Sequence, residues 1–165
     1  MTRAGRGALV VIALAGAACS SMKAAVDIHA PPERVWAVLS DVEHYHCWNP
    51  FFVNARGTLR EGESLTLTMK PVGKDTQTFS PTVLEVKPGA SFTWRGRLGV
   101  PGLFDGRHTL SLERVDATHT RFVQEESFSG VFVPFVGFDP YRAGWERMNQ
   151  ALKARVEAIF ASERR

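Results

Sequence analysis

The sequence predicts an α+β domain in which a curved antiparallel sheet of about six to seven strands wraps around one long C-terminal helix. Residues 51–128 alternate between apolar and polar side chains, and turn signals separate the alternating runs. Residues 139–160 instead place apolar side chains three or four positions apart, which is typical of an amphipathic helix. Two short helical stretches follow the first strand. A sheet with one apolar face and a single long helix bury both surfaces by packing together.

Length and composition favour one globular domain with an apolar interior. The chain has 165 residues, of which 44% are hydrophobic, and its aromatic residues are eleven Phe and four Trp against two Tyr. The formal net charge is +3, and it falls to +1 without Arg3 and Arg6, which lie in a segment that we expect to be removed. Lys and Arg do not cluster with aromatic residues, so we expect no nucleic-acid partner.

The N-terminal part of the domain predicts a strand over residues 22–29 and two short helices. The run Ala30–Glu33 opens the first helix, because Pro is tolerated in a first turn and Glu favours the positive end of a helix. Asp41 is expected to cap the second helix. Asn49-Pro50 ends it, because a residue before Pro avoids helical backbone angles.

The central region predicts an antiparallel meander whose strands are joined by short turns. The turn signals are at residues 60–62, 72–75, 87–89 and 116–118. The side chains that alternate onto the apolar faces are Leu65, Leu67 and Met69, then Phe92 and Trp94, then His108, Leu110 and Leu112, and finally Phe122, Gln124, Glu126 and Phe128. A glycine series at 96, 99, 102 and 106 joins two strands and opens no helix, so it predicts a flexible hairpin and not a phosphate loop.

Residues 129–139 form an apolar connector to the last helix, which Asp139-Pro140 begins. Phe132, Phe135 and Phe138 stand in this connector, where a loop in water is normally polar. We therefore expect the three rings to form a mobile apolar lid over a pocket mouth, which could also touch lipid.

The first 21 residues predict a signal peptide or lipoprotein leader, and residues 22–165 the domain itself. Arg3 and Arg6 precede an apolar run over residues 8–18, which is too short for a comfortable membrane span. Cys19 follows small residues and is a candidate for lipidation, which predicts a periplasmic protein or a membrane-anchored lipoprotein with membrane association through the N-terminus. The alternative is that translation starts at Met22 and the protein is cytoplasmic. Cys47 is expected to be an unpaired, buried thiol, and a Cys19–Cys47 disulfide remains open.

Several motifs resemble one protein superfamily. The run Ile28–Asp41 (IHAPPERVWAVLSD), followed by Tyr45, Trp48, Asn49 and Pro50, is similar to the start of SRPBCC proteins, a START-like and polyketide cyclase/dehydrase-like superfamily. Residues 94–108 and 120–130 resemble an uncharacterised bacterial branch of it. The resemblance covers residue 22 to the end and implies a helix-grip fold with an internal hydrophobic pocket. It leaves activity open, because the superfamily hosts carriers, receptors and enzymes alike.

The sharpest polar signal is the set His108, Gln124 and Glu126 on otherwise apolar strand faces. A buried polar group without a partner costs about 1–3 kcal/mol, so these groups either bond one another or meet a ligand. If their strands are hairpin neighbours, His108 and Glu126 can approach each other. A carboxylate beside an imidazole favours the cationic form, and the pair could then act as acid and base.

Aromatic rings are expected to supply most of the pocket wall. The predicted ligand-binding residues are Trp48, Phe51, Trp94, Phe104, His108, Gln124, Glu126, Phe128, Phe132, Phe135 and Trp145. The run His44-x-His46-Cys47 looks metal-like, but no second ligand pair at a suitable spacing completes a zinc site, so we expect no metal. No pattern implies a cofactor.

Three functions remain open at this point. The first is binding, transport or sequestration of a small hydrophobic or amphipathic molecule by a monomer or dimer. The second is a cyclase- or dehydratase-like enzyme in which His108 and Glu126 are the acid/base pair. The third is a protein–protein interaction module that uses residues 132–138.

Overall fold

A computed structural model describes residues 18–163, and its main sheet has five antiparallel strands in the order β1-β8-β7-β6-β5. Their bounds are β1 (Ala18–Ile28), β5 (Thr82–Lys87), β6 (Ser91–Leu98), β7 (Phe104–Arg114) and β8 (Thr120–Gly130). Short turns join each neighbouring pair from β5 to β8, so the predicted meander is confirmed. β1 forms one edge of this sheet and pairs with β8 along its whole length.

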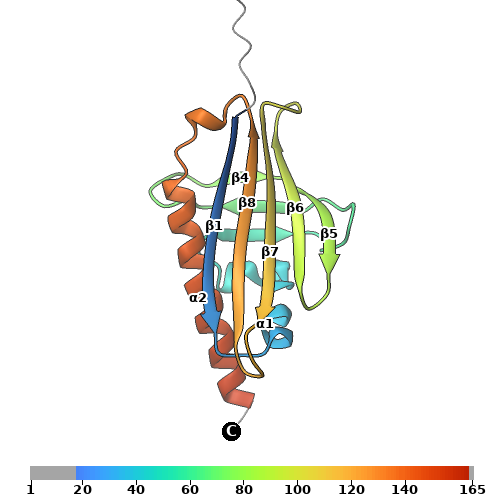
Figure 1. The fold of residues 1–165 in the computed structure, drawn as a ribbon, viewed down its shortest axis with the longest axis vertical. Coiled ribbons are helices and arrows are strands. Elements are labelled where there is room, and N and C mark those ends of the chain that lie inside the picture. Colours follow the sequence, from blue (N-terminus) through green and yellow to red (C-terminus); the bar gives the residue numbers. More distant parts are fainter. Residues whose placement is uncertain (1–17, 164–165) are drawn as a thin grey trace, which may run out of the picture.

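A smaller sheet crosses behind the long strands at a steep angle (Figure 1). It contains β2 (Phe52–Arg56), β3 (Thr66–Met69) and β4 (Gln77–Phe79), in that order. An isolated bridge between Ser64 and Thr82 connects the approach to β3 with the start of β5. The described residues thus form eight strands, slightly more than the six to seven expected, because the curved surface divides into two sheets.

The helices follow the predicted order. They are α1 (Pro32–Leu39), the 3₁₀ turns η1 (Val42–Cys47) and η2 (Val133–Phe135), and the long helix α2 (Asp139–Glu163), which lies beside β1 (Figure 1). The α+β class and the helix grip are therefore confirmed. Asp41 stands at the cap position of η1, but its side chain makes no cap hydrogen bond. Its carboxylate instead lies 2.8 Å from Nδ1 of His44, so the predicted capping role is wrong.

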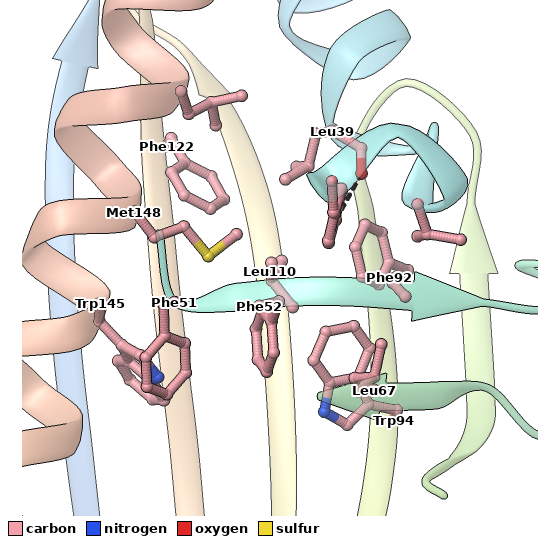
Figure 2. Close-up of a cluster of buried hydrophobic side chains, with 14 of the residues drawn as sticks. Leu39, Phe51, Phe52, Leu67, Phe92, Trp94, Leu110, Phe122, Trp145 and Met148 are labelled. Carbon is pink, nitrogen blue, oxygen red and sulfur yellow. Dashed lines mark hydrogen bonds between the residues drawn. The ribbon is translucent and has the colours of Figure 1, made fainter. Parts of the chain in front are cut away.

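The apolar core lies where α2 faces β2 and the inner face of the long sheet. Figure 2 shows Trp145 and Met148 of α2 directed toward this core, which also contains Phe52. Phe51 reaches the helix so closely that a Cβ on Gly144 would lie 2.2 Å from its ring. The Phe51 ring therefore packs directly on the backbone of α2 at Gly144.

The β6–β7 hairpin and the connector after β8 are joined at one end of the molecule, which we call the tip (residues 98–104 and 130–136). The amides of Val131 and Phe132 donate to the carbonyl oxygens of Gly102 and Leu103 at 3.1 and 3.0 Å. Gly130 has φ +134°, and a Cβ there would lie 2.4 Å from the Leu103 oxygen, so only glycine fits. The predicted glycine hairpin is confirmed, with Gly99 and Gly102 at positive φ.

Strand β1 begins four residues before the predicted start at Met22. Ala18 pairs with Gly130, so the chain that precedes β1 joins the domain at the tip. The predicted leader lies mostly outside the described residues, and only its last four residues belong to β1. Within residues 18–163, no helix has the length and apolar character that a bilayer span requires.

Candidate functional site

The predicted polar residues meet on the inner face of the long sheet. In the β7–β8 register His108 lies directly opposite Glu126, and the same row continues to Trp94 on β6 and Met22 on β1. The His108 Nδ1 and Glu126 Oε2 atoms are 3.8 Å apart. That distance exceeds the range of a hydrogen bond, so the two groups are neighbours and not a bonded pair.

His108 is enclosed by aromatic rings. Its imidazole stacks on Trp145 with ring centroids 4.4 Å apart, and it meets the edge of Trp94 at 5.0 Å. Only 2% of the side chain is exposed. Burial lowers the pKa of His108 to about 3, and the interaction with the Gln124 side chain offsets this only in part. The expectation of a cationic His108 is therefore wrong, because burial removes the imidazole from water and desolvation disfavours its charged form.

Glu126 occupies the border between this filled region and the tip. Its side chain is 17% exposed, and among the described residues it accepts or donates no hydrogen bond. Burial alone raises the pKa of Glu126 to about 8, so the carboxyl is protonated at neutral pH. Its Oε1 atom lies over Gly106, where a Cβ would approach it to 2.5 Å. The Glu126 carboxyl group is thus an uncharged hydrogen-bond donor that packs on the backbone of β7 at a position without a side chain.

Gln124 forms a hydrogen bond with a residue that was not among the predicted site residues. Its Nε2 donates to Oδ1 of Asn149 on α2 at 2.6 Å, and both residues are almost fully buried. The Gln124 Oε1, Asn149 Nδ2 and His108 Nε2 atoms have no hydrogen-bond partner among the described residues. Asn149 stands four positions after Trp145 on the buried stripe of α2, and that spacing was the available signal.

The predicted aromatic residues of the pocket wall form two groups. One group is fully buried in the core, and the other is partly buried and lies nearer the tip. Phe51, Trp94 and Trp145 are at most 2% exposed and belong to the core. Nearer the tip, Phe128 contacts Phe104 and Phe138, with ring centroids 5.5 and 4.5 Å apart. Phe104 and Phe138 are only partly buried. The partly buried rings therefore lie on the tip side of Glu126.

The predicted lid does not close over this region. Phe132 and Phe135 are 46% and 83% exposed, whereas Phe138 turns inward onto Phe128. The expectation that all three rings cover one mouth is wrong, because the two backbone hydrogen bonds to the β6–β7 hairpin hold residues 131–132 on the outer side of the tip. The three phenylalanines thus have two different environments.

Serine substitutions should separate these environments. We expect Phe132→Ser and Phe135→Ser to change the free energy of unfolding by less than about 0.5 kcal/mol, as for ordinary surface sites. Phe138→Ser should cost about 1–3 kcal/mol, because it removes ring contacts with Phe128. Urea unfolding of the three single variants measures this. Equal losses at all three positions would show that Phe132 and Phe135 are packed in solution.

Trp48 lies in a different place, at a hollow between α1, η1 and the C-terminal half of α2. The hollow holds about 350 Å³ and is also lined by Arg34, Arg155 and Cys47. A second hollow lies on the outer face of the sheet around Lys23. Neither of the two includes His108, Gln124 or Glu126 in its lining.

The two cysteines and the His44 region make local contacts only. Cys47 is exposed and free, so the expectation of a buried thiol is wrong, and Cys19 is likewise exposed and free on β1. The Cys47 Sγ atom lies 3.3 Å from His46 Nε2, while His46 Nδ1 lies 2.9 Å from the Glu43 carbonyl. The hydrogen bond to Asp41 raises the pKa of His44. Within residues 18–163, no three His, Cys, Asp or Glu side chains gather to hold a metal.

Solved structures share this arrangement of sheet and helix. A START superfamily protein from Mycobacterium smegmatis is 21% identical with a TM-score of 0.66, and the match covers 84% of this chain and 98% of that one. The Zhui aromatase/cyclase from Streptomyces sp. R1128 is 18% identical with a TM-score of 0.63, over 85% and 94%. Norcoclaurine synthase from Thalictrum flavum is 13% identical with a TM-score of 0.64, over 86% and 96%. At such identities these similarities establish the fold alone.

The sequence itself identifies the family. No curated protein sequence matches the chain significantly. The family model described as polyketide cyclase/dehydrase and lipid transport matches residues 20–160, which is most of the chain. The chain therefore belongs to the polyketide cyclase/dehydrase and lipid transport family, within the SRPBCC superfamily.

Proposed function

We propose that this protein binds a small apolar molecule that carries one hydrogen-bond acceptor, and that the Glu126 carboxyl donates to that acceptor. Its family makes the chain a hydrophobic-ligand-binding or cyclase-like domain. We add that the ligand binds beside Glu126 and that the carboxyl group of this residue holds the ligand by a hydrogen bond. The observation that carries it is a protonated, unbonded carboxyl at the edge of a packed aromatic core.

The surroundings of Glu126 favour a ligand on its tip side. Gly96 and Gly106 pair across β6 and β7, so the inner face of the sheet carries no side chain there. A Cβ on Gly96 would reach the Phe79 ring of β4 at 3.6 Å. The Phe79 ring and the Glu126 carboxyl thus cover bare backbone at these two glycines. A ligand would be inserted here by displacing the half-buried rings of Phe104 and Phe138.

The chemistry of the anchor selects the ligand class. A protonated carboxyl donates one hydrogen bond, which suits the oxygen of a ketone, an ester or an ether. Burial of the rest of the ligand among aromatic rings contributes about 25 cal/mol per Å² of apolar surface. A neutral carbonyl compound therefore fits better than a cation, for which the site offers no counter-charge at neutral pH.

An enzymatic role for Glu126 is the second candidate. A carboxyl group with a pKa near 8 is protonated at neutral pH and could act as a general acid in a cyclisation or dehydration. His108 does not support the acid/base pair expected from the sequence, because its pKa is about 3 and it lies 3.8 Å from the carboxyl. An enzyme of this kind would use Glu126 without His108.

Two fluorescent probes test the anchor. Prodan carries a ketone oxygen, whereas N-phenyl-1-naphthylamine has a similar apolar surface without a carbonyl group. We expect Glu126→Leu to weaken prodan binding about three- to tenfold, as for one hydrogen bond, and to leave the second probe unchanged. Wild-type affinity for prodan should also fall above pH 8, where the donor is lost. Fluorescence titration measures both.

Glu125→Leu is the matched control, because Glu125 points to the outer face and pairs with Lys23 there. It should bind both probes as the wild type does. An equal loss of both probes in Glu126→Leu would contradict the anchor, and so would binding that does not saturate. Catalytic conversion of a bound carbonyl compound that is lost in Glu126→Gln but retained in His108→Gln would instead support the enzymatic candidate.

A further inference from the structure

We propose that the tip is a membrane-docking surface that inserts apolar side chains into a bilayer containing anionic lipids. Five large hydrophobic side chains are exposed in the described part of the chain, and four of them belong to the tip. These are Leu98 and Val100 on the β6–β7 hairpin, and Phe132 and Phe135 on the connector. The inference goes beyond ligand binding and does not depend on it.

The four side chains act as one surface because their segments are hydrogen-bonded to each other. The contacts of Val131 with Gly102 and of Phe132 with Leu103 place the connector against the hairpin. Pro101 and Pro134 are also exposed there. Figure 1 shows both segments at the same end of the molecule, beyond the ends of the long strands. The apolar face of an interfacial helix is buried about 5–10 Å into the boundary between headgroups and acyl chains, and we expect a similar depth for the apolar tip.

Charge on the outer face of the sheet complements an anionic surface. Arg95 and Arg107 are exposed and lie directly opposite each other in the β6–β7 register. Among the described residues neither has an ion-pair partner, although like charges that face each other across a sheet are unfavourable. Arg97, nearer the tip, is paired with Asp105 at 2.5 Å. Two exposed cations without a contacting carboxylate thus lie behind the apolar end, and the Asp105 charge reaches Arg95 only at longer range.

The distance between the two features fits a bilayer surface. Arg95 precedes Leu98 by three residues on an extended strand, which spans about 10 Å. With Leu98 inserted below the headgroups, Arg95 and Arg107 would lie at the level of the lipid phosphates. Each such cation contributes about a fivefold gain in affinity for an anionic surface at low salt.

The path of the chain also favours a bilayer over another protein as the occupant. β1 begins at the tip, since Ala18 pairs with Gly130. The residues that precede it include most of the apolar run of residues 8–18. The described chain therefore begins at the end of the molecule that carries the exposed apolar loops.

Tryptophan reporters distinguish docking through the tip from binding through the N-terminal sequence. Phe135→Trp places a reporter on the tip, and Val115→Trp places one at another exposed apolar position, beyond the end of β7. Both are made in the full-length chain and mixed with vesicles of phosphatidylcholine and anionic phosphatidylglycerol that carry brominated acyl chains. We expect quenching of the Phe135→Trp signal above the wild-type background, and none for Val115→Trp.

Two further variants test the apolar and the basic parts separately. Val100→Ser/Phe135→Ser should raise the lipid concentration for half-maximal binding roughly tenfold in vesicle flotation, while Val115→Ser leaves it unchanged. Arg95→Gln/Arg107→Gln should remove most of the preference for anionic over neutral vesicles and most of the salt dependence. Thermal unfolding confirms that each variant is folded.

Three results would overturn the proposal. One is vesicle binding without quenching of the Phe135→Trp signal, which assigns the binding to the N-terminal sequence alone. Another is equal quenching at positions 115 and 135. The third is a failure of the wild type to bind either vesicle while the tip substitutions abolish an association between copies of the protein, which assigns the surface to a protein contact.

Discussion

Replacing Trp145 with Ala lowers the free energy of unfolding by about 3–5 kcal/mol, the range for a fully buried aromatic side chain. Trp145 is 1% exposed and stacks on His108 at 4.4 Å, so its loss leaves a cavity between α2 and the sheet. Urea unfolding followed by far-ultraviolet circular dichroism measures the change. The sequence placed Trp145 in a pocket wall, and the size of the loss decides between that role and core packing.

Trp48→Ala is the matched control, because Trp48 is only partly buried and lies at the hollow beside α1. We expect a loss of about 1 kcal/mol there, near the centre of ordinary substitutions. A Trp145→Ala protein as stable as the wild type would show that the ring faces an open cavity in solution. That result would contradict the conclusion that the core around His108 is fully packed.

Raising the pH from about 6.5 to 8 lowers the free energy of unfolding by about 1 kcal/mol, because the folded state holds a proton on Glu126 that the unfolded chain has already lost. The pKa of Glu126 rises from 4.5 to about 8 on folding, so stability decreases with pH across that window. The pKa of His108 falls from 6.5 to about 3, so its contribution increases with pH up to 6.5. The two contributions change in opposite directions between pH 4.5 and 6.5, and above pH 6.5 the Glu126 contribution dominates.

Glu126→Gln should abolish the decline above pH 6.5, since the amide does not titrate. Glu125→Gln should keep it, because that carboxylate is on the outer face beside Lys23. Urea titrations at pH 5.5, 6.5 and 8.0 in the three proteins give the comparison. If the decline persisted unchanged in Glu126→Gln, the proton would belong to another group and the neutral anchor would lose its support.

The alternation of side chains was enough to predict the fold and the row of polar residues. His108 and Glu126 have the same parity along adjacent strands joined by a short turn, so a hairpin had to bring them together. The alternation of side chains does not indicate how deeply each position is buried in the core. The same two residues therefore differ sharply, with His108 under two tryptophan rings and Glu126 partly open. The sign of the His108 shift followed from that depth and could not be predicted from proximity alone.

The connector shows a second limit of sequence patterns. Phe132, Phe135 and Phe138 look equivalent in an apolar run, but their directions depend on how the backbone leaves β8. Gly130 turns the chain onto the hairpin, which leaves Phe132 and Phe135 outside, and the start of α2 returns Phe138 to the core. Asn149 was missed for a related reason, because its partner Gln124 is 25 residues away in sequence.

The close approach of Gly130 to the Leu103 carbonyl has a mechanical consequence for the protein. Two main-chain hydrogen bonds and a contact that tolerates no side chain fasten the loop after β8 to the turn between β6 and β7. The two loops are therefore expected to move together, so that a displacement of Phe135 also displaces Phe104 at the start of β7.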